Sequence, residues 1–217
     1  MTVIVGILCS DGVVIASDSA ATYSAGAIQT IGQQHVTKIW KIENSVIYAA
    51  SGAIGIAQLS LNAVEALWKA RELSSTKVST PAEAMARISR EMVTRVEGIQ
   101  RSASVLAPIL GAHVAGQSAM CQSLLTMPFK RKAMLVQFYA NGAPELATEE
   151  LPFISIGLGQ QIADPFLAFL KRILWKDRQP TTAEGRLVAA WTVKHVAETI
   201  PGGVGGPLQM ASLSMTA

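Results

Sequence analysis

Four residues in the first quarter of the chain could together cleave an amide bond: Thr2, Asp18, Lys38 and Gly52. A threonine hydroxyl is a weak nucleophile, but the neutral α-amine of the same residue can take its proton when that residue is N-terminal. Thr2 follows Met1, so removal of one residue would free this amine. A nearby lysine ammonium lowers the local proton affinity, and an aspartate can hold that lysine in place. A glycine amide beyond a buried strand can serve as the oxyanion donor.

The first element that must position these residues is a hairpin. Residues 3–8 are rich in β-branched apolar side chains on both faces, which predicts a strand covered on both sides. Asp11-Gly12 is a strong signal for a two-residue turn, and residues 13–16 predict the returning strand. A tight turn would bring Asp18 back to the end of the sheet that carries Thr2.

A second hairpin would supply the other two residues. Residues 36–42 predict a strand with Lys38 near its start, and residues 46–50 predict its partner, which ends at Ser51-Gly52. Each residue also has an ordinary interpretation when it is taken alone. Threonine is common at position two, an isolated strand lysine is usually at an edge with its ammonium in water, and Asp18 could simply begin a turn.

Together these residues resemble the proteasome β-subunit family, which belongs to the N-terminal-nucleophile hydrolases. The resemblance is carried by Thr2, the segment 11–18, Lys38-Ile39 and Ser51-Gly52. The intervals from Thr2 to Asp18 and from Lys38 to Gly52 match the family. The interval between Asp18 and Lys38 is a few residues longer, which places a longer loop at 23–34. The similarity covers residues 2–70 well and the rest loosely.

Two later segments depart from the family pattern. A Gly-Ser-Gly segment of the family corresponds here to Gly157-Leu158-Gly159, which lacks the auxiliary serine. The Asp-x-x-Ser-Gly segment corresponds to residues 201–207, which lack both the acid and the hydroxyl. This segment is more similar to the bacterial proteasome homologues Anbu and the β-proteobacterial homologue. The departures bear on rate and substrate rather than on the type of reaction.

The resemblance implies a self-compartmentalising threonine endopeptidase that acts on peptides or unfolded proteins. It implies a homo-oligomer of stacked heptameric rings, and it leaves any unfoldase partner unidentified. In this reading Thr2 is the nucleophile, Lys38 supplies positive charge, Asp18 orients Lys38, and the Gly52 amide stabilises the oxyanion. The positions that line the family's primary specificity pocket are occupied by Ala21, Thr22, Ala50, Ile54 and Gln58. These residue types imply a mostly apolar pocket.

The rest of the chain predicts helices and strands in alternating blocks. The expected helices cover residues 53–73, 80–100, a stretch that begins with Asp164-Pro165 as cap, and 181–199. The expected later strands cover residues 106–114, 133–140, 153–157 and 208–213. Residues 118–129 could form an extra hairpin or an interface loop. This order predicts an α+β fold of four layers, αββα, in which helices flank two antiparallel sheets, as a single domain over residues 1–217.

Composition limits the other classes of function. Charged residues make up only 15% of the chain, below the usual quarter or so, so we expect much of the surface to be buried between subunits. The basic cluster at 130–132 is not interleaved with aromatic residues, so nucleic-acid binding is not expected. Residues 102–129 carry no Asp, Glu, Lys or Arg. We interpret this stretch as buried or interface structure, with a transmembrane helix as the lesser alternative.

The compartment and the absence of a cofactor are also expectations from the sequence. Two cysteines, Cys9 and Cys121, cannot form a disulfide framework, and no cationic segment precedes an apolar start. Both observations favour the cytoplasm. No phosphate loop, dinucleotide fingerprint or metal-ligand cluster is present, so we expect no cofactor and no metal. Two alternative functions stay open: an amidase or acyltransferase for a small molecule, and a non-catalytic ring subunit.

Overall fold

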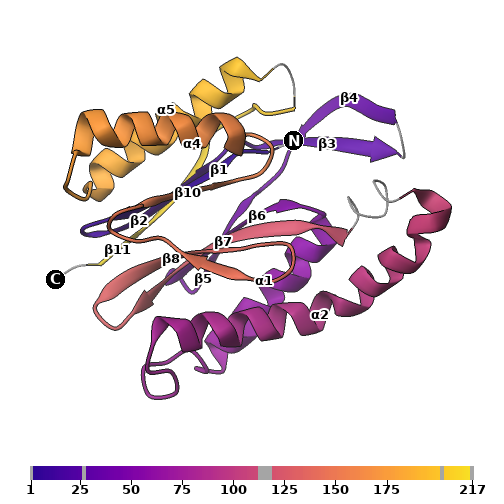
Figure 1. The fold of residues 1–217 in the computed structure, drawn as a ribbon, viewed down its shortest axis with the longest axis horizontal. Helices are drawn as coiled ribbons and strands as arrows, with labels where there is room; N and C mark the ends of the chain where they lie inside the picture. The colour runs from indigo at the N-terminus through magenta and orange to yellow at the C-terminus, as the bar shows by residue number, and fades with distance from the viewer. Residues whose placement is uncertain (1, 26–27, 112–118, 201–202, 216–217) are drawn as a thin grey trace.

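The structure, a computed structural model, describes residues 2–25, 28–111, 119–200 and 203–215, and its elements form four layers (Figure 1). One sheet has the order β10 (Phe153–Ile156), β1 (Ile4–Cys9), β2 (Gly12–Ser17), β11 (Gln209–Ser214). The other has the order β5 (Ile39–Ile42), β6 (Val46–Gly52), β7 (Cys121–Phe129), β8 (Lys132–Phe138), β9 (Pro144–Leu146). Neighbouring strands are antiparallel in both sheets.

The helices form the two outer layers (Figure 1). The outer face of the five-stranded sheet is covered by α1 (Ile54–Lys69) and α2 (Pro81–Leu110). The outer face of the four-stranded sheet is covered by α4 (Gln160–Leu170), a π-helical turn η1 (Lys171–Trp175) and α5 (Thr182–Thr199). A separate hairpin, β3 (Ala20–Ala25) and β4 (Ile28–His35), projects beside the sheets. The predicted αββα fold is therefore confirmed.

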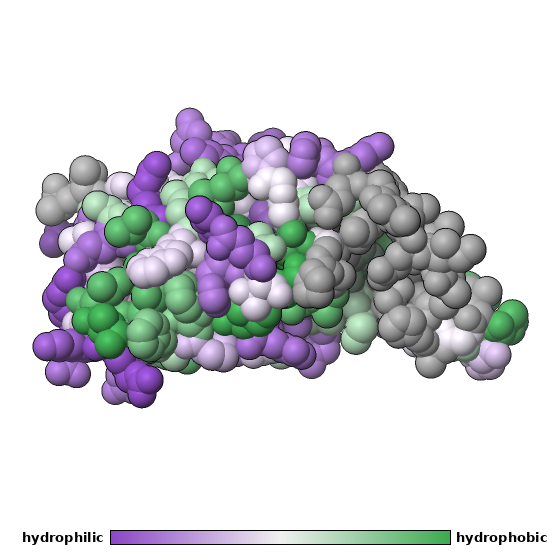
Figure 2. Space-filling view, turned by 90° about the horizontal axis from the view of Figure 1, so that it is seen from above, coloured by the Kyte–Doolittle hydropathy of each residue, from purple (hydrophilic) through white to green (hydrophobic). Residues whose placement is uncertain are grey.

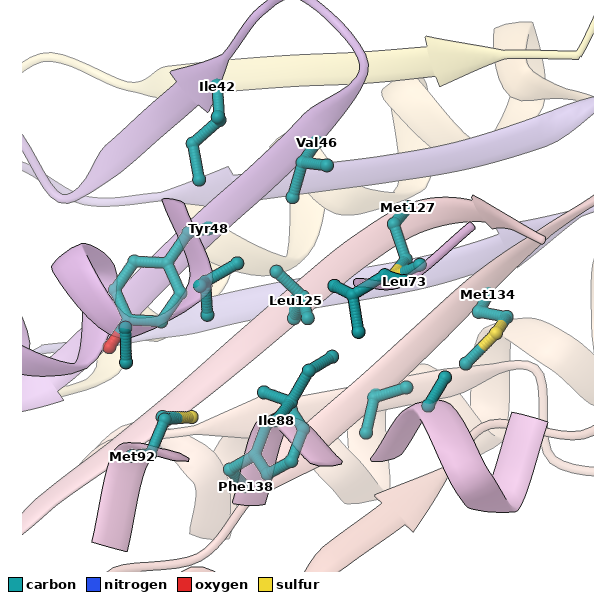
Figure 3. Close-up of a cluster of buried hydrophobic side chains, with 14 of the residues drawn as sticks. Ile42, Val46, Tyr48, Leu73, Ile88, Met92, Leu125, Met127, Met134 and Phe138 are labelled. Carbon is teal, nitrogen blue, oxygen red and sulfur yellow. The ribbon is translucent and has the colours of Figure 1, made fainter. Parts of the chain in front are cut away.

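Apolar side chains fill each of the three spaces between the layers. Figure 3 shows the cluster between the five-stranded sheet and its helices, where Tyr48, Leu125 and Phe138 meet Ile88 and Met92 of α2. A second cluster lies between the two sheets, and a third lies under α4 and α5. Because residues on β1 alternate between the second and third clusters, both faces of this strand are buried. This explains the continuous apolar run that begins the chain.

The first hairpin turns one residue earlier than expected. Cys9 pairs with Gly12, so the turn residues are Ser10 and Asp11 rather than Asp11 and Gly12. Gly12 has a different task, because a Cβ there would lie 2.1 Å from the main-chain oxygen of Leu213 on β11. The glycine therefore permits the close approach of a third strand.

Three further predictions near the site are refined by the structure. In the stretch expected to be a loop, residues 23–25 belong to β3 and residues 28–34 belong to β4. β5 begins at Ile39, so Lys38 precedes the strand instead of lying within it. The first helix ends at Lys69 rather than Leu73.

The predicted strand at 106–114 is wrong where the structure describes it. Helix α2 continues to Leu110, well beyond the expected end near residue 100. The hydroxyls of Ser102 and Ser104 donate to carbonyls four residues earlier, as helical serines do. A short apolar run does not distinguish a strand from a helix by periodicity. Residues 121–129, left open between a hairpin and a loop, form the central strand β7; residues 112–118 lie outside the described part of the chain.

The cap predicted at Asp164-Pro165 is also wrong, because both residues lie inside α4, which begins at Gln160. The Asp164 carboxylate accepts from the Ser155 hydroxyl at 2.5 Å and from the Gln160 amide at 3.1 Å. It thus ties the helix to β10 instead of capping an N-terminus. The helix expected at 181–199 is confirmed as α5, and Thr181 and Glu184 form a capping box at its N-terminus. In the described ranges, no helix has the length and apolarity that crossing a membrane requires.

Candidate active site

The side chain of Lys38 connects the predicted nucleophile to the predicted acid. Its Nζ donates to Thr2 Oγ1 at 3.0 Å and to Asp18 Oδ1 at 2.8 Å. Lys38 is 4% exposed and Asp18 is 1% exposed, so this ion pair is buried away from water and dissolved salt screens it only weakly. The structure therefore brings together three residues that the sequence separates by up to 36 positions.

The first hairpin explains why Thr2 and Asp18 are neighbours. The β1–β2 pairing extends one step past the strands, where the Asp18 N–H donates to the Val3 carbonyl at 3.3 Å. The Asp18 carboxylate accepts in return from the Val3 N–H at 3.0 Å. It also accepts from the N–H groups of Ala20 and Gly205, both at 3.2 Å. With Lys38, the buried carboxylate thus has four donors, which fix its orientation.

Two opposing effects act on the charge of the Lys38 ammonium. Burial lowers the pKa of the Lys38 ammonium from its usual value, and the charge and hydrogen bond of Asp18 act in the other direction. The Lys38 main chain is held from both sides: its N–H donates to Gln209 Oε1 at 2.8 Å, and its carbonyl accepts from the Ala50 N–H at 3.4 Å. The cation is therefore placed by its main chain as well as by its ion pair.

Two glycines bring β10 and α4 against the main chain of Thr2. The Gly159 N–H donates to the Thr2 carbonyl at 3.1 Å. Gly157 has a φ of +91°, and a Cβ there would lie 2.4 Å from the Thr2 carbonyl oxygen and 2.9 Å from the Ser51 hydroxyl. Only glycine fits this close approach. The segment that lacks the auxiliary serine therefore supports Thr2 through its backbone. The Ser51 hydroxyl lies close to the same glycine, Gly157.

A cavity of about 460 Å³ opens at Thr2 and Lys38. Four of the five predicted pocket residues line it: Ala21, Ala50, Ile54 and Gln58. The fifth, Thr22, lies on β3, and its side chain is outside what the structure describes. The sequence interpretation missed seven other lining residues: Ala20, Val36, Thr37, Trp40, Ser51, Ala57 and Leu158. Trp40 could have been found, because it lies two residues after Lys38 and alternation along an extended chain puts both on one face.

Gly52 lines the same cavity at the end of β6. Its φ is +129°, and a Cβ would lie 2.3 Å from the Met120 carbonyl oxygen, so this position requires glycine. The backbone of Gly52 is thus presented to the cavity without a side chain. No group of three His, Cys, Asp or Glu residues within the described ranges is arranged to hold a metal ion.

Comparison with known sequences identifies a family. A family model described as "Proteasome subunit" matches residues 2–123, more than half of the chain. The proteasome subunit beta of Methanococcus maripaludis strain C5 is 31% identical over 88 residues, which cover 41% of this chain and 38% of that protein. The same protein from strain C7 matches to the same extent. The chain thus aligns with well under half the length of these relatives.

Comparison with solved structures extends the likeness to nearly the whole chain. Anbu (ancestral beta-subunit) from Yersinia bercovieri superposes with a TM-score of 0.64 at 18% identity, covering 98% of this chain and 81% of that one. The structure titled "Helical Assembly of the Anbu Complex" from Pseudomonas aeruginosa superposes with a TM-score of 0.64 at 17% identity and the same coverage. At these identities the superpositions establish the fold, and the match over residues 2–123 establishes the family. This chain belongs to the proteasome subunit family, with the architecture of a proteasome-like β-subunit.

Proposed function

We propose that this chain is a peptidase subunit whose nucleophile is Thr2, freed at its α-amine by cleavage of the Met1–Thr2 bond. One observation carries the proposal: the buried Lys38 ammonium contacts both Thr2 Oγ1 and the Asp18 carboxylate. A lysine buried only for packing needs a counter-ion, but it needs no contact with a hydroxyl at the mouth of a cavity. The contact with Thr2 therefore favours a chemical role over a structural one.

In the proposed reaction, Thr2 Oγ1 attacks the carbonyl carbon of a peptide bond. The free α-amine of Thr2 takes the hydroxyl proton, directly or through water. Lys38 stabilises the charge that develops on Oγ1, and the Gly52 N–H donates to the oxyanion. The C–N bond then breaks, the leaving amine takes the proton from the Thr2 amine, and an ester remains. Water, deprotonated by the same amine, attacks the ester and releases the acid, which restores Thr2.

The cavity indicates which substrates the site would accept. Its lining is mainly apolar around Ala50, Ile54 and Trp40, and Gln58 adds an amide. Trp40 is held against Tyr48, with ring centroids 6.0 Å apart. A volume of about 460 Å³ accommodates a large apolar side chain next to the scissile bond. We therefore propose peptides or unfolded proteins with large apolar residues at the cleavage position as the substrate class.

We also propose that the chain functions as a homo-oligomer. Exposed apolar side chains lie on the outer helical layer, among charged ones (Figure 2). They include Phe169, Ile173, Leu174, Leu187 and Trp191, which are 43–66% exposed. Apolar surface of this kind is usual where subunits meet. Enclosure of the sites within an assembly, in stacked rings or in a helical arrangement, would confine the peptidase activity.

The direct test of the proposed function is covalent labelling. We expect a peptide epoxyketone to add one molecule to each chain, as measured by intact mass, and Thr2→Ala to abolish the adduct. Thr37→Ala is the matched control, because Thr37 is a second threonine that lines the same cavity. Failure of the Met1-free protein to be labelled would instead favour a non-catalytic subunit. Hydrolysis of small amides without hydrolysis of casein would favour the small-molecule amidase.

A further inference from the structure

Gln209 connects the two sheets at the end of the molecule that carries the site. It begins β11 of the four-stranded sheet, and its side-chain amide reaches the segment that leads into β5 of the other sheet. Oε1 accepts from the Lys38 N–H at 2.8 Å, and Nε2 donates to the Val36 carbonyl at 2.5 Å. A single planar amide therefore satisfies an N–H and a C=O that are two residues apart, as a neighbouring strand would do.

This contact matters because Lys38 lies outside the strand ladder. The pairing of β5 with β6 begins at Ile39 and Ala49, one step after Lys38. Among the described contacts, the main chain of Lys38 makes one hydrogen bond besides that to Gln209: its carbonyl accepts from the Ala50 N–H at the long distance of 3.4 Å. Within the described residues, the Gln209 bond is thus the shorter of the two main-chain hydrogen bonds of Lys38, and the second Gln209 bond holds the chain two residues earlier, at Val36.

The same C-terminal segment also supports Asp18. Gln209 pairs across the sheet with Ser17, the residue before Asp18. Four positions earlier, the Gly205 N–H donates to Asp18 Oδ2 at 3.2 Å. The Gly205 carbonyl accepts from the N–H groups of Ser19 and Ala20 at 3.1 and 3.0 Å. Residues 205–209 therefore make hydrogen bonds to both members of the Lys38–Asp18 ion pair, through Gln209 and Gly205.

We propose that Gln209 is a positioning residue for the reaction: its amide fixes the main chain at residues 36 to 38 so that the Lys38 ammonium reaches Thr2 Oγ1. This inference rests on the function proposed above. It also gives the C-terminal segment a role that does not depend on the acid and hydroxyl it lacks. Gln209 does not contact the reacting atoms, and it acts only through Lys38.

The test replaces the amide without shortening the side chain. Gln209→Met removes both hydrogen bonds and keeps a similar length. Gln100→Met is the matched control, because the Gln100 amide also donates to a carbonyl, that of Ala140, at 3.0 Å and away from the site. Each protein is freed of Met1, and its active sites are counted by epoxyketone labelling before its rate is measured.

For Gln209→Met we expect kcat per labelled site to fall by about 10- to 100-fold, since a misplacement of about 1 Å costs rates of this order, while KM changes little. We also expect the acid limb of the pH–rate profile to shift upwards, towards the pKa of about 7.7–8.0 of a free α-amine, because the ammonium no longer lies beside Thr2. A role in stability alone would lower the melting temperature without moving this limb. An unchanged kcat per site with an unchanged limb overturns the inference.

A crystal structure of Gln209→Met gives a second readout that needs no activity. We expect Lys38 Nζ to move away from Thr2 Oγ1, from which it lies 3.0 Å in the unaltered chain. An unmoved Nζ overturns the inference even if the unaltered protein proves inactive. Conversely, a displaced Nζ supports the inference about Gln209, whereas absence of labelling in the unaltered protein counts against the proposed function alone.

Discussion

Replacement of Lys38 by methionine should abolish most of the activity and leave a folded protein. The Lys38 charge lies 3.0 Å from the Thr2 oxygen. At an effective dielectric constant of about 20, a full negative charge at that distance would be stabilised by about 5.5 kcal/mol. A charge that is half developed in the transition state would gain about half as much. Since each 1.36 kcal/mol changes the rate tenfold, we expect Lys38→Met to lower kcat/KM by about 100- to 10,000-fold.

The stability cost of the same change can be bounded from the contacts of Asp18. Removing one partner of a buried ion pair costs about 3–5 kcal/mol, against a typical total stability of about 5–15 kcal/mol. Three N–H donors, from Val3, Ala20 and Gly205, still bind the carboxylate. We therefore expect a cost at the lower end of that range, and a cooperative unfolding transition at lower denaturant concentration.

The assay compares kcat/KM on an apolar fluorogenic peptide with urea unfolding, both at neutral pH. Lys41→Met is the control, because Lys41 lies on the same strand, β5, with its side chain exposed. We expect this control to change neither quantity appreciably. Retention by folded Lys38→Met of more than about a tenth of the rate would refute the electrostatic role of Lys38.

Three further predictions concern the cavity, the approach to Thr2 and the acid limit of stability. Ala50→Phe should fill the cavity, so kcat/KM should fall for substrates with large apolar residues and persist for alanine substrates. Gly157→Ala should displace Thr2 and cost about 1–3 kcal/mol in urea unfolding, whereas Gly55→Ala, with open space around it, should cost nothing. Hydrogen bonding to Arg178, and then to the Thr181 main chain, lowers the pKa of Glu184 from 4.5 to about 2. The ionised Glu184 therefore stabilises the folded protein fully above pH 4.5, and this contribution is lost as the pH falls towards 2. Glu184→Gln should therefore flatten acid unfolding in that window, as followed by circular dichroism.

The core of the site could be predicted from the sequence because local patterns determine it. The apolar run before Asp18 and the turn at Ser10-Asp11 fix the β1–β2 register, and that register alone brings Asp18 to Thr2. The error of one residue in the turn did not matter, because the register is also set by burial of alternate side chains.

The contacts made across the molecule could not be predicted in this way. Gln209 and Lys38 are 171 residues apart, and nothing in the composition around Gln209 indicates that its amide crosses between sheets. Residues 118–129, which contain β7, were left open between a hairpin and a loop, because buried polar residues such as Ser123 and Thr126 interrupt the apolar pattern. Packing of β7 between two neighbouring strands and between two layers outweighs the weak intrinsic strand preference of its residues.

The most direct measurement of the central claim compares intact mass with turnover in samples that keep Met1 and samples that have lost it. With Met1 attached, the nitrogen of Thr2 is an amide and cannot take the hydroxyl proton, although Asp18, Lys38 and Gly52 are unchanged. We therefore expect turnover to follow the fraction of chains that begin at Thr2, and to vanish when none do. Full turnover in a sample whose mass shows Met1 on every chain would contradict the N-terminal-nucleophile mechanism.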